Sequence, residues 1–315
     1  MKQAIVFSGQ GAQFSGMGRE MFDAFECARD VFLQIDDALN RHLSRLMFEG
    51  DEAELTSTQN AQPAIFACSM ATVATIEKLS GKKISEIFSF AAGHSLGEYG
   101  ALCAGGVFDI PTTARLLQKR GEFMAQAAQS AGGGMAAIIG LDTGKIAQIC
   151  AESQEKTGEV CVVANDNAPA QTVISGQTDA LEQAMRACTE SGAKRALKLN
   201  VAGAFHSPLM QKACDKMNAV LRETAFNDPT LPVLTDAFAS PAVDAAQIRE
   251  ALSVQMVKGV RWREIMAYME SRQVERVVEA GAGAVLKGLV KRNSAVMTGV
   301  APNTPAEIEE FLKSI

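Results

Sequence analysis

The chain has 315 residues, of which 47% are hydrophobic and 21% charged, an ordinary globular composition that can bury a substantial core. The formal net charge of −6 at pH 7 and the lack of a lysine- and arginine-rich block argue against nucleic acid as a partner. No apolar run approaches the roughly 20 residues that span a bilayer. The apolar run at residues 4–7 is too short for a signal-peptide core, so we expect no membrane association.

The seven cysteines are scattered singly, and none belongs to a Cys-x-x-Cys pair. An odd number of dispersed cysteines is typical of reduced, mostly buried thiols rather than of a disulfide framework, which indicates a cytoplasmic protein. Only three histidines are present, so we predict no metal site built from Cys and His ligands.

The first 132 residues alternate between predicted strands and helices, the pattern of an α/β protein. In chain order we predict a buried strand at residues 4–7, a buried helix at 62–79 with Pro63 in its first turn, a buried strand at 88–92 and a helix at 112–129. The glycines at 132–134 indicate a boundary.

Beyond these glycines the order of predicted elements changes. Strands are predicted at residues 135–140, 159–165, 171–175 and 195–199, and helices at 143–155 and 178–191. Their order, βαββαβ, is that of a ferredoxin-like unit. We therefore expect a small ferredoxin-like domain at residues 133–200, inserted into a large α/β-hydrolase-like domain with a parallel sheet formed by residues 1–132 and 201–315.

A Gly-x-Ser-x-Gly motif runs from Gly93 to Gly97, after the second predicted strand and before a predicted helix. Such a turn exposes the serine Oγ, and the start of the helix offers free N–H groups to an oxyanion. Glycine is expected at both ends because a Cβ would clash with the turn and with the neighbouring strand. The motif predicts Ser95 as a nucleophile, although an incidental serine in a glycine-rich turn has the same pattern.

A serine nucleophile needs a general base, and three histidines are candidates. His42 lies on a charged helical face and is expected to be solvated. His94 adjoins the serine on the sharp turn, where neighbouring side chains usually point in different directions. His206 lies among turn residues after a strand, a position suited to catalysis, and is the favoured base. A hydrogen-bonded core histidine is the alternative interpretation of His206.

Three segments together resemble a known family. The segments SGQGAQ at 8–13, GHSLGE at 93–98 and FHSPLM at 205–210 are similar, in order and separation, to the malonyl-CoA:acyl-carrier-protein transacylases of bacterial fatty-acid synthesis and to related acyltransferase domains of polyketide synthases. Further similar segments lie at 59–64, 165–169, 255 and 260–262, so the resemblance covers the whole chain.

The resemblance implies a role for each matching residue. Ser95 would be the nucleophile and His206 its base, with the main-chain carbonyl of Gln255 orienting the imidazole in place of an acidic third member. The backbone N–H groups of Gln10 and Leu96 would form the oxyanion hole.

The resemblance also implies a set of substrate-binding residues. Arg120 would pair with the free carboxylate of malonate, which a planar guanidinium can hold through two parallel hydrogen bonds. The residue pattern alone does not distinguish Arg120 from Lys119 or from an ordinary surface charge. Asn167 and Asn165 would approach the substrate from the small domain. Phe205 would crowd an α-methyl branch, with core packing as the alternative explanation of an aromatic residue there.

Two segments depart from the family pattern. The sequence Gly281-Ala282-Gly283-Ala284 lacks the proline and lysine that many members carry, and Asp236 stands where an asparagine is common. We expect neither departure to touch the proposed chemistry.

The implied activity is a two-step transfer of malonyl from malonyl-CoA to the phosphopantetheine thiol of acyl carrier protein, through a malonyl-serine ester, in fatty-acid biosynthesis. The coenzyme A thioester is a substrate, no cofactor is expected, and the protein is expected to be a monomer. Because acyl carrier proteins are acidic, a basic rim is expected; its candidates are Lys198, Lys258, Arg261, Lys287, Lys291 and Arg292.

Two other function classes stay open at this point. A hydrolase of esters or thioesters would use the same serine and histidine, and a binding module could keep the fold without catalysis. Arg120 and the Gly9-Gln10-Gly11 turn favour transfer over hydrolysis, and the presence of both Ser95 and His206 disfavours a binding module. The residues do not distinguish a fatty-acid carrier from a polyketide carrier.

Overall fold

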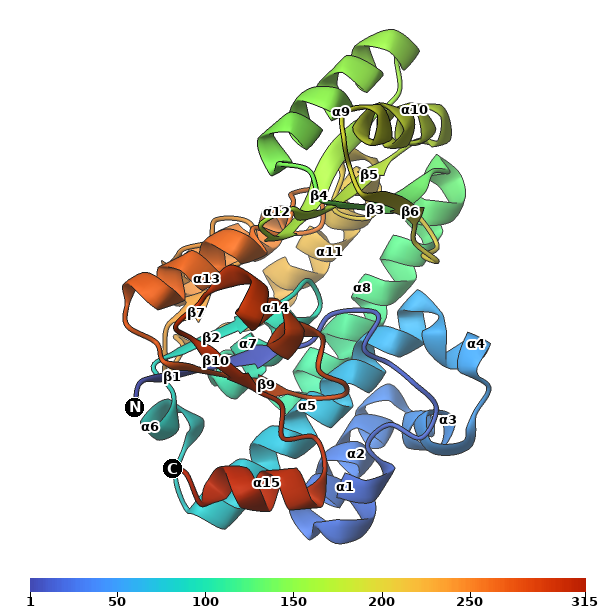
Figure 1. Ribbon diagram of the computed structural model, residues 1–315. Coiled ribbons are helices and arrows are strands. Elements are labelled where there is room, and N and C mark those ends of the chain that lie inside the picture. Colours follow the sequence, from blue (N-terminus) through green and yellow to red (C-terminus); the bar gives the residue numbers. More distant parts are fainter.

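The computed structural model describes all 315 residues and contains two β-sheets. Figure 1 shows a larger α/β part and a smaller part above it that carries two helices on one face of its sheet. None of the helices is both long and apolar enough to cross a membrane.

The larger sheet has the strand order β10-β9-β1-β2-β7-β8. Every neighbouring pair is parallel except β7 and β8 at one edge, so the predicted parallel sheet is confirmed. Its strands are β1 (Gln3–Phe7), β2 (Phe90–Gly93), β7 (Val233–Leu234), β8 (Pro241–Ala242), β9 (Arg276–Ala280) and β10 (Thr298–Val300). The central strands β1, β2 and β9 are buried along their whole length, as expected when helices cover both faces of a parallel sheet.

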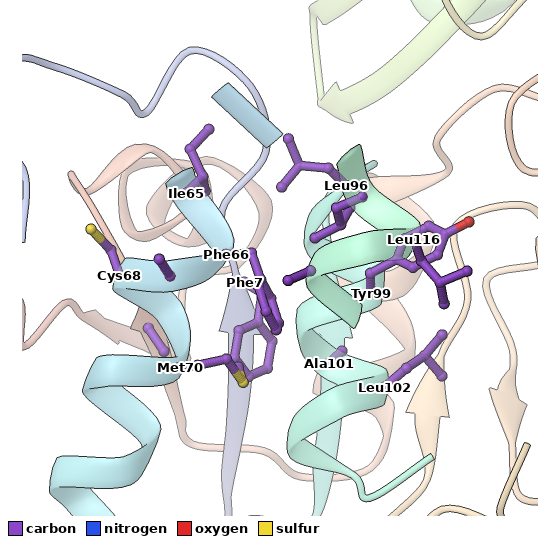
Figure 2. Packing of buried hydrophobic residues seen from close by; sticks show 14 of the residues in the cluster. Phe7, Ile65, Phe66, Cys68, Met70, Leu96, Tyr99, Ala101, Leu102 and Leu116 are labelled. Atoms are coloured by element: carbon purple, nitrogen blue, oxygen red, sulfur yellow. The ribbon is translucent and has the colours of Figure 1, made fainter. Parts of the chain in front are cut away.

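The helices around this sheet come from both ends of the chain. They are α1 (Arg19–Ala24), α2 (Glu26–Leu39), α3 (Leu43–Glu49), α4 (Glu52–Thr56), α5 (Thr58–Ser80), α6 (Ile84–Ile87), α7 (Gly97–Ala104), α8 (Ile110–Ala131), a short 3-10 turn at Pro208–Met210, α11 (Gln211–Glu223), α12 (Ala245–Val254), α13 (Trp262–Ser271), α14 (Val285–Asn293) and α15 (Pro305–Leu312). Figure 2 shows how the core is packed between β1, α5 and α7: Phe7 of β1 lies against Phe66 and Met70 of α5.

The position of Pro63 differs from the prediction. Helix α5 begins at Thr58, four residues before the predicted start, so Pro63 lies inside the helix and not in its first turn. Proline there leaves the carbonyl of Gln59 without its helical N–H donor. Helix α8 packs so closely on this turn that a Cβ added to Gly121 would lie 2.7 Å from Gln59 Cα. Tertiary packing therefore holds in helical form a turn that the proline by itself disfavours.

The smaller sheet has the strand order β4-β5-β3-β6, and all its neighbouring strands are antiparallel. Its elements are β3 (Gly134–Ile139), α9 (Thr143–Thr157), β4 (Cys161–Ala168), β5 (Gln171–Gly176), α10 (Thr178–Glu190) and β6 (Arg195–Lys198). This is the ferredoxin-like arrangement expected from the sequence, with element ends within three residues of the predicted ones. The assignment of residues 133–200 as a separate domain stays a prediction.

The smaller part packs against the larger one through both apolar and polar contacts. One face of its sheet packs against α9 and α10 and forms a separate hydrophobic core. By contrast, Met135, Ala164 and Val173 of this sheet belong to the hydrophobic core of the larger part. The backbone of β4 also pairs with Val260, and Asp166 forms an ion pair with Arg263 at 2.7 Å. These contacts bring β4 close to the segments of the larger part that surround the predicted site.

The backbones of β1 and α7 approach each other closely at Gly97. A Cβ added to Gly97 would lie 2.1 Å from the carbonyl oxygen of Phe7, so the Gly97→Ala variant must push the helix and strand apart. We expect the free energy of unfolding, measured in urea, to fall by about 3 kcal/mol or more, as for severe overpacking.

The matched control is Gly288→Ala in α14, where an added Cβ meets no atom within 4 Å. Replacing an interior helix glycine with alanine there should raise stability by about 0.5–1 kcal/mol. Equal effects of the two substitutions would contradict the packing argument.

Candidate active site

Ser95 lies on the sharp turn between β2, which ends at Gly93, and α7, which begins at Gly97. Its backbone has φ +56°, a left-handed conformation that is strained for a residue with a side chain. A Cβ on Gly93 would lie 1.9 Å from the backbone of Gly97, and a Cβ on Gly97 would meet the carbonyl of Phe7. Both glycines are therefore required by sterics, as the sequence predicts, and the turn exposes the serine hydroxyl.

The hydroxyl of Ser95 is hydrogen-bonded to His206, with Oγ 2.7 Å from Nε2. The other ring nitrogen, Nδ1, lies 3.1 Å from the carbonyl oxygens of both Gln255 and Lys258. Two carbonyl acceptors require a proton on Nδ1, which leaves Nε2 free to accept the serine proton. The carbonyl of Gln255 was predicted for this position; that of Lys258 was not.

The imidazole of His206 is held in its neutral form. Burial lowers its pKa to about 3, and the nearby positive charge of Arg120 acts in the same direction. At neutral pH the ring is therefore unprotonated, which is the state that a general base needs. No carboxylate touches the ring, since both partners of Nδ1 are main-chain carbonyls.

Arg120 extends from α8 into the core behind Ser95 and is only 1% exposed. Its guanidinium donates to Gln62 Oε1 at 2.8 Å, to Gln255 Oε1 at 3.0 Å and to Ser95 Oγ at 3.2 Å. Its Nε has no hydrogen-bond partner, and the guanidinium lies over the ring of Tyr99. A buried cation with only neutral hydrogen-bond partners is costly, because none of the groups that replace water directly at the guanidinium is an anion. The position suits an anionic ligand group next to Ser95 Oγ.

A pocket of about 310 Å³ opens in front of the serine. Its walls come from the loop after β1, the serine turn, β4 and the segment that follows β6. Five of the predicted site residues line it: Gln10, Ser95, Asn165, Phe205 and His206. The other predicted residues, Leu96, Arg120, Asn167 and Gln255, surround the pocket without lining it.

Two backbone N–H groups beside the serine are available as donors. Those of Gln10 and Leu96 form no hydrogen bond within the chain. Gln10 follows β1 at the pocket wall, and Leu96 is the first residue after the serine, at the start of α7. This pair fits the predicted oxyanion hole, which needs two unpaired donors aimed at the reacting carbonyl.

The small part of the chain contributes asparagines to the site, as predicted. Asn165 of β4 is buried and lines the pocket. Oδ1 of Asn167, on the same strand, accepts from His94 Nε2 at 2.8 Å, and the main-chain carbonyl of Asn167 accepts from Asn293 Nδ2. His94 is thus directed away from the serine hydroxyl, and its pKa is lowered by burial.

The third histidine lies outside the site. The side chain of His42 is 86% exposed at the start of α3, which agrees with the solvated position predicted for it.

One expectation about Asp236 is wrong. The sequence indicated that Asp236 would not touch the chemistry, but its Oδ2 accepts the N–H of Ser95 at 2.9 Å. Glu98, which the sequence did not single out, is fully buried beside it and accepts from the side-chain amide of Gln255 at 2.9 Å. Two sequence signals could have pointed to these residues: Asp236 lies just beyond the short strand β7, at the end where parallel strands place their ligands, and Glu98 closes the segment GHSLGE.

The fold and site define a class of protein: enzymes that carry an acyl group on a serine activated by histidine. Residues 4–305 match the family model described as "Acyl transferase domain". The chain belongs to this acyl transferase domain family.

Curated relatives and solved structures match over nearly full length. The chain is 39% identical to the malonyl CoA-acyl carrier protein transacylase of Bacillus subtilis (strain 168), over 100% of this chain and 97% of that protein. It is 39% identical to the protein of the same name from Escherichia coli (strain K12), over 98% of each.

Among solved structures, the acyl-carrier-protein-S-malonyltransferase of Bartonella henselae is 41% identical with a TM-score of 0.94, over 100% of this chain and 99% of that one. The malonyl-transacylase PlMCAT, in complex with the type II PKS acyl-carrier protein AntF, is 37% identical with a TM-score of 0.95, over 100% of both chains.

The positive charge of Arg120 should have a measurable effect on the pKa of His206. In the wild type we expect the His206 ring to stay neutral from about pH 5 to 8, because its pKa is lowered to about 3. The Arg120→Gln variant removes the second-largest cause of that shift, so the pKa should rise while burial keeps it below 6.5.

Side-chain NMR of the three labelled histidines, in the wild type and in the variant, measures both pKa values of His206. A wild-type His206 that titrates near 6.5 would contradict the geometry.

Proposed function

We propose that this chain is a malonyl-CoA:acyl carrier protein transacylase of fatty-acid biosynthesis. The observation that carries the proposal is the buried guanidinium of Arg120, which reaches Ser95 Oγ at 3.2 Å and has only neutral hydrogen-bond partners. An acyl group with a free carboxylate would give the guanidinium a directly hydrogen-bonded anion at the place where the ester would form. The printed names of the relatives, malonyl transacylases and malonyltransferases, support the same substrate.

The first half-reaction joins the malonyl group to the serine. Ser95 Oγ attacks the thioester carbonyl carbon while its proton moves to His206 Nε2, 2.7 Å away. The carbonyl oxygen becomes an oxyanion that accepts from the N–H groups of Gln10 and Leu96, each worth about 3 kcal/mol of transition-state stabilisation. The intermediate collapses, the carbon–sulfur bond breaks, and the coenzyme A sulfur takes the proton from Nε2. The product is a malonyl ester of Ser95.

The second half-reaction uses the same residues in reverse order. The phosphopantetheine thiol of acyl carrier protein gives its proton to His206 and attacks the ester carbonyl. The same two N–H groups stabilise the oxyanion, the bond between the acyl carbon and Ser95 Oγ then breaks, and the protonated imidazole returns its proton to Oγ. One thioester replaces another, so the exchange is close to energy-neutral and needs no ATP, metal or redox cofactor; the coenzyme A thioester is a substrate.

The acyl group is held by charge and selected by shape in this proposal. Arg120 would turn its guanidinium toward the malonyl carboxylate, forming charge-assisted hydrogen bonds that are stronger than those to its present neutral partners. Phe205, 4% exposed and adjacent to His206, would leave no room for an α-methyl branch. Asn165 and Asn167 of β4 would close the pocket from the opposite side.

We place the reaction in the cytoplasm. All seven cysteines are free thiols and five of them are buried, which suits a reducing compartment.

The carrier protein would dock on α14 in this proposal. Of the six basic candidates, Lys198 and Arg261 already form ion pairs with Glu182 and Glu264, and the ammonium of Lys258 lies over the ring of Phe238. Lys287, Lys291 and Arg292 are exposed on α14 and form no ion pair, and this helix contacts β4 through Asn293. An acidic carrier on α14 would therefore lie close to the side of the pocket formed by β4.

Intact-protein mass spectrometry after mixing with malonyl-CoA tests the acyl-enzyme. We expect one malonyl adduct on the wild type and none on Ser95→Ala, because the serine oxygen forms the ester. Adding holo acyl carrier protein should discharge the adduct and load the carrier. No adduct and no carrier loading would overturn the proposal, and discharge by water alone would indicate a hydrolase.

Charge reversal tests the docking surface. The double variant Lys287→Glu and Lys291→Glu should raise the KM for the carrier about tenfold or more and leave the KM for malonyl-CoA nearly unchanged, since rim charges act mainly on association. The wild-type KM for the carrier should also rise with ionic strength. The matched control is Lys78→Glu with Lys82→Glu, exposed lysines in the last turn of α5 and in the turn that follows it. Equal effects of the two pairs would exclude α14 as the docking surface.

A further inference from the structure

Two buried carboxyl groups at the site have no role in the mechanism described above. Glu98 lies in the first turn of α7 and is 0% exposed, and Asp236 follows β7 and is 1% exposed. The two residues are in direct contact, because the backbone N–H of Asp236 donates to Glu98 Oε2 at 3.2 Å. Two carboxylates that are adjacent and cut off from water cannot both be ionised without a large cost.

The donors around the pair occupy only half of its oxygens. The side-chain amide of Gln255 donates to Glu98 Oε2 at 2.9 Å and to Asp236 Oδ2 at 3.3 Å. The N–H of Asp236 also donates to Glu98 Oε2, and the N–H of Ser95 donates to Asp236 Oδ2. The remaining oxygens, Glu98 Oε1 and Asp236 Oδ1, are buried and have no donor. A proton on the pair supplies a donor where the chain provides none.

Only one cation is near enough to balance a negative charge on the pair, and it is reached indirectly. Arg120 donates to Gln255 Oε1 at 3.0 Å, and the Nε2 of the same amide donates to both carboxyl groups. The Gln255 side chain therefore connects the guanidinium to the pair. The Gln255 side chain also donates to the carbonyl of Ser95 at 2.8 Å. The backbone carbonyl and the backbone N–H of Ser95 are therefore both hydrogen-bonded, the first to Gln255 and the second to Asp236.

We propose that Glu98 and Asp236 share a single proton and that this half-ionised pair is a positioning device for Ser95. Asp236 acts through the backbone N–H of the serine, which it holds in the left-handed conformation of the turn. One negative charge on the pair balances the charge of Arg120, which is connected to the pair through Gln255. The part of the inference that concerns the substrate's carboxylate rests on the proposed function; the shared proton does not.

The surroundings favour retention of the proton. Burial, followed by the charge of Glu98, raises the pKa of Asp236 well above its ordinary value, and burial raises the pKa of Glu98. The other titratable groups that face this network are Arg120, Tyr99, Cys214 and His206. Arg120 opposes the increase, whereas burial keeps the tyrosine and the thiol protonated and the imidazole neutral.

Loss of the shared proton has a consequence that can be measured. At alkaline pH the pair would carry two negative charges beside Ser95 and beside the incoming malonyl carboxylate. The second-order rate constant for malonyl-serine formation should therefore fall on the alkaline side of its pH profile.

The decisive variant is Asp236→Asn. Its amide oxygen keeps an acceptor for the Ser95 N–H, and its amide N–H₂ gives Glu98 a permanent donor in place of the shared proton. We expect acylation within about threefold of the wild type at neutral pH and no alkaline fall. Asp236→Ala removes the acceptor and should be about 10- to 100-fold slower at every pH, as for a lost hydrogen bond to a charged group.

Infrared difference spectroscopy detects the proton without any substrate. The wild-type spectrum minus that of Asp236→Asn, at neutral pH, should contain the C=O stretch of a protonated carboxylic acid. The matched control is Asp37→Asn on α2, an exposed aspartate, whose difference spectrum should contain only carboxylate bands. If Asp236→Asn does not fold, the Glu98→Gln variant replaces it in the experiment. This variant also leaves one carboxyl group beside a neutral amide, so the pair again carries a single negative charge.

The outcomes separate this inference from the proposed function. A carboxylic-acid band together with loss of the alkaline fall supports the shared proton. The lack of that band, an unchanged alkaline fall in Asp236→Asn, or an asparagine variant as slow as the alanine variant overturns it. A wild type that forms no malonyl adduct overturns the proposed function, while the infrared result still decides whether the proton is shared.

Discussion

The site depends on one steric constraint, the close contact of the turn at Ser95 with strand β1. Gly97 lies so near the Phe7 carbonyl that no side chain fits, and this contact sets where α7 begins. The serine between β2 and α7 is forced to φ +56°, so its hydroxyl projects away from the sheet. Conformational strain of this kind is kept only where the surroundings over-determine it. Here Asp236 and Gln255 hold the serine's N–H and carbonyl.

The remaining groups converge on that serine from distant segments of the chain. His206 reaches Oγ from the turn before α11, and Arg120 reaches it from α8. Gln255 serves twice: its carbonyl fixes the tautomer of the imidazole, and its side chain joins Arg120 to the carboxyl pair. Removing this glutamine's side chain would therefore disturb the cation, the nucleophile's backbone and the acid pair together, because they share hydrogen bonds.

Much of the fold could be predicted because its signals are local. Alternating apolar runs and glycine turns were enough to place β1 and β2 of the larger sheet, all four strands of the smaller sheet and the ferredoxin-like order of residues 134–198, whereas β7, β8, β9 and β10 were not predicted. The prediction was wrong at Pro63, since proline usually begins a helix but here lies inside α5. The local sequence around Pro63 carries no signal of the close packing of Gly121 against Gln59, because this contact joins two different helices.

By itself, the sequence determined strands β1 and β2, helices α5 and α8, the elements of the smaller part, the serine turn and, through the family resemblance, the residues that surround this turn. Only the tertiary structure decided that Asp236 binds the Ser95 backbone, that Glu98 lies beside it, and that the Lys258 carbonyl shares the imidazole proton. These groups are separated by up to 141 residues, and an acidic residue carries no pattern that names its partner. Their roles arise from burial, which removes water and leaves each polar atom only the neighbours that packing supplies.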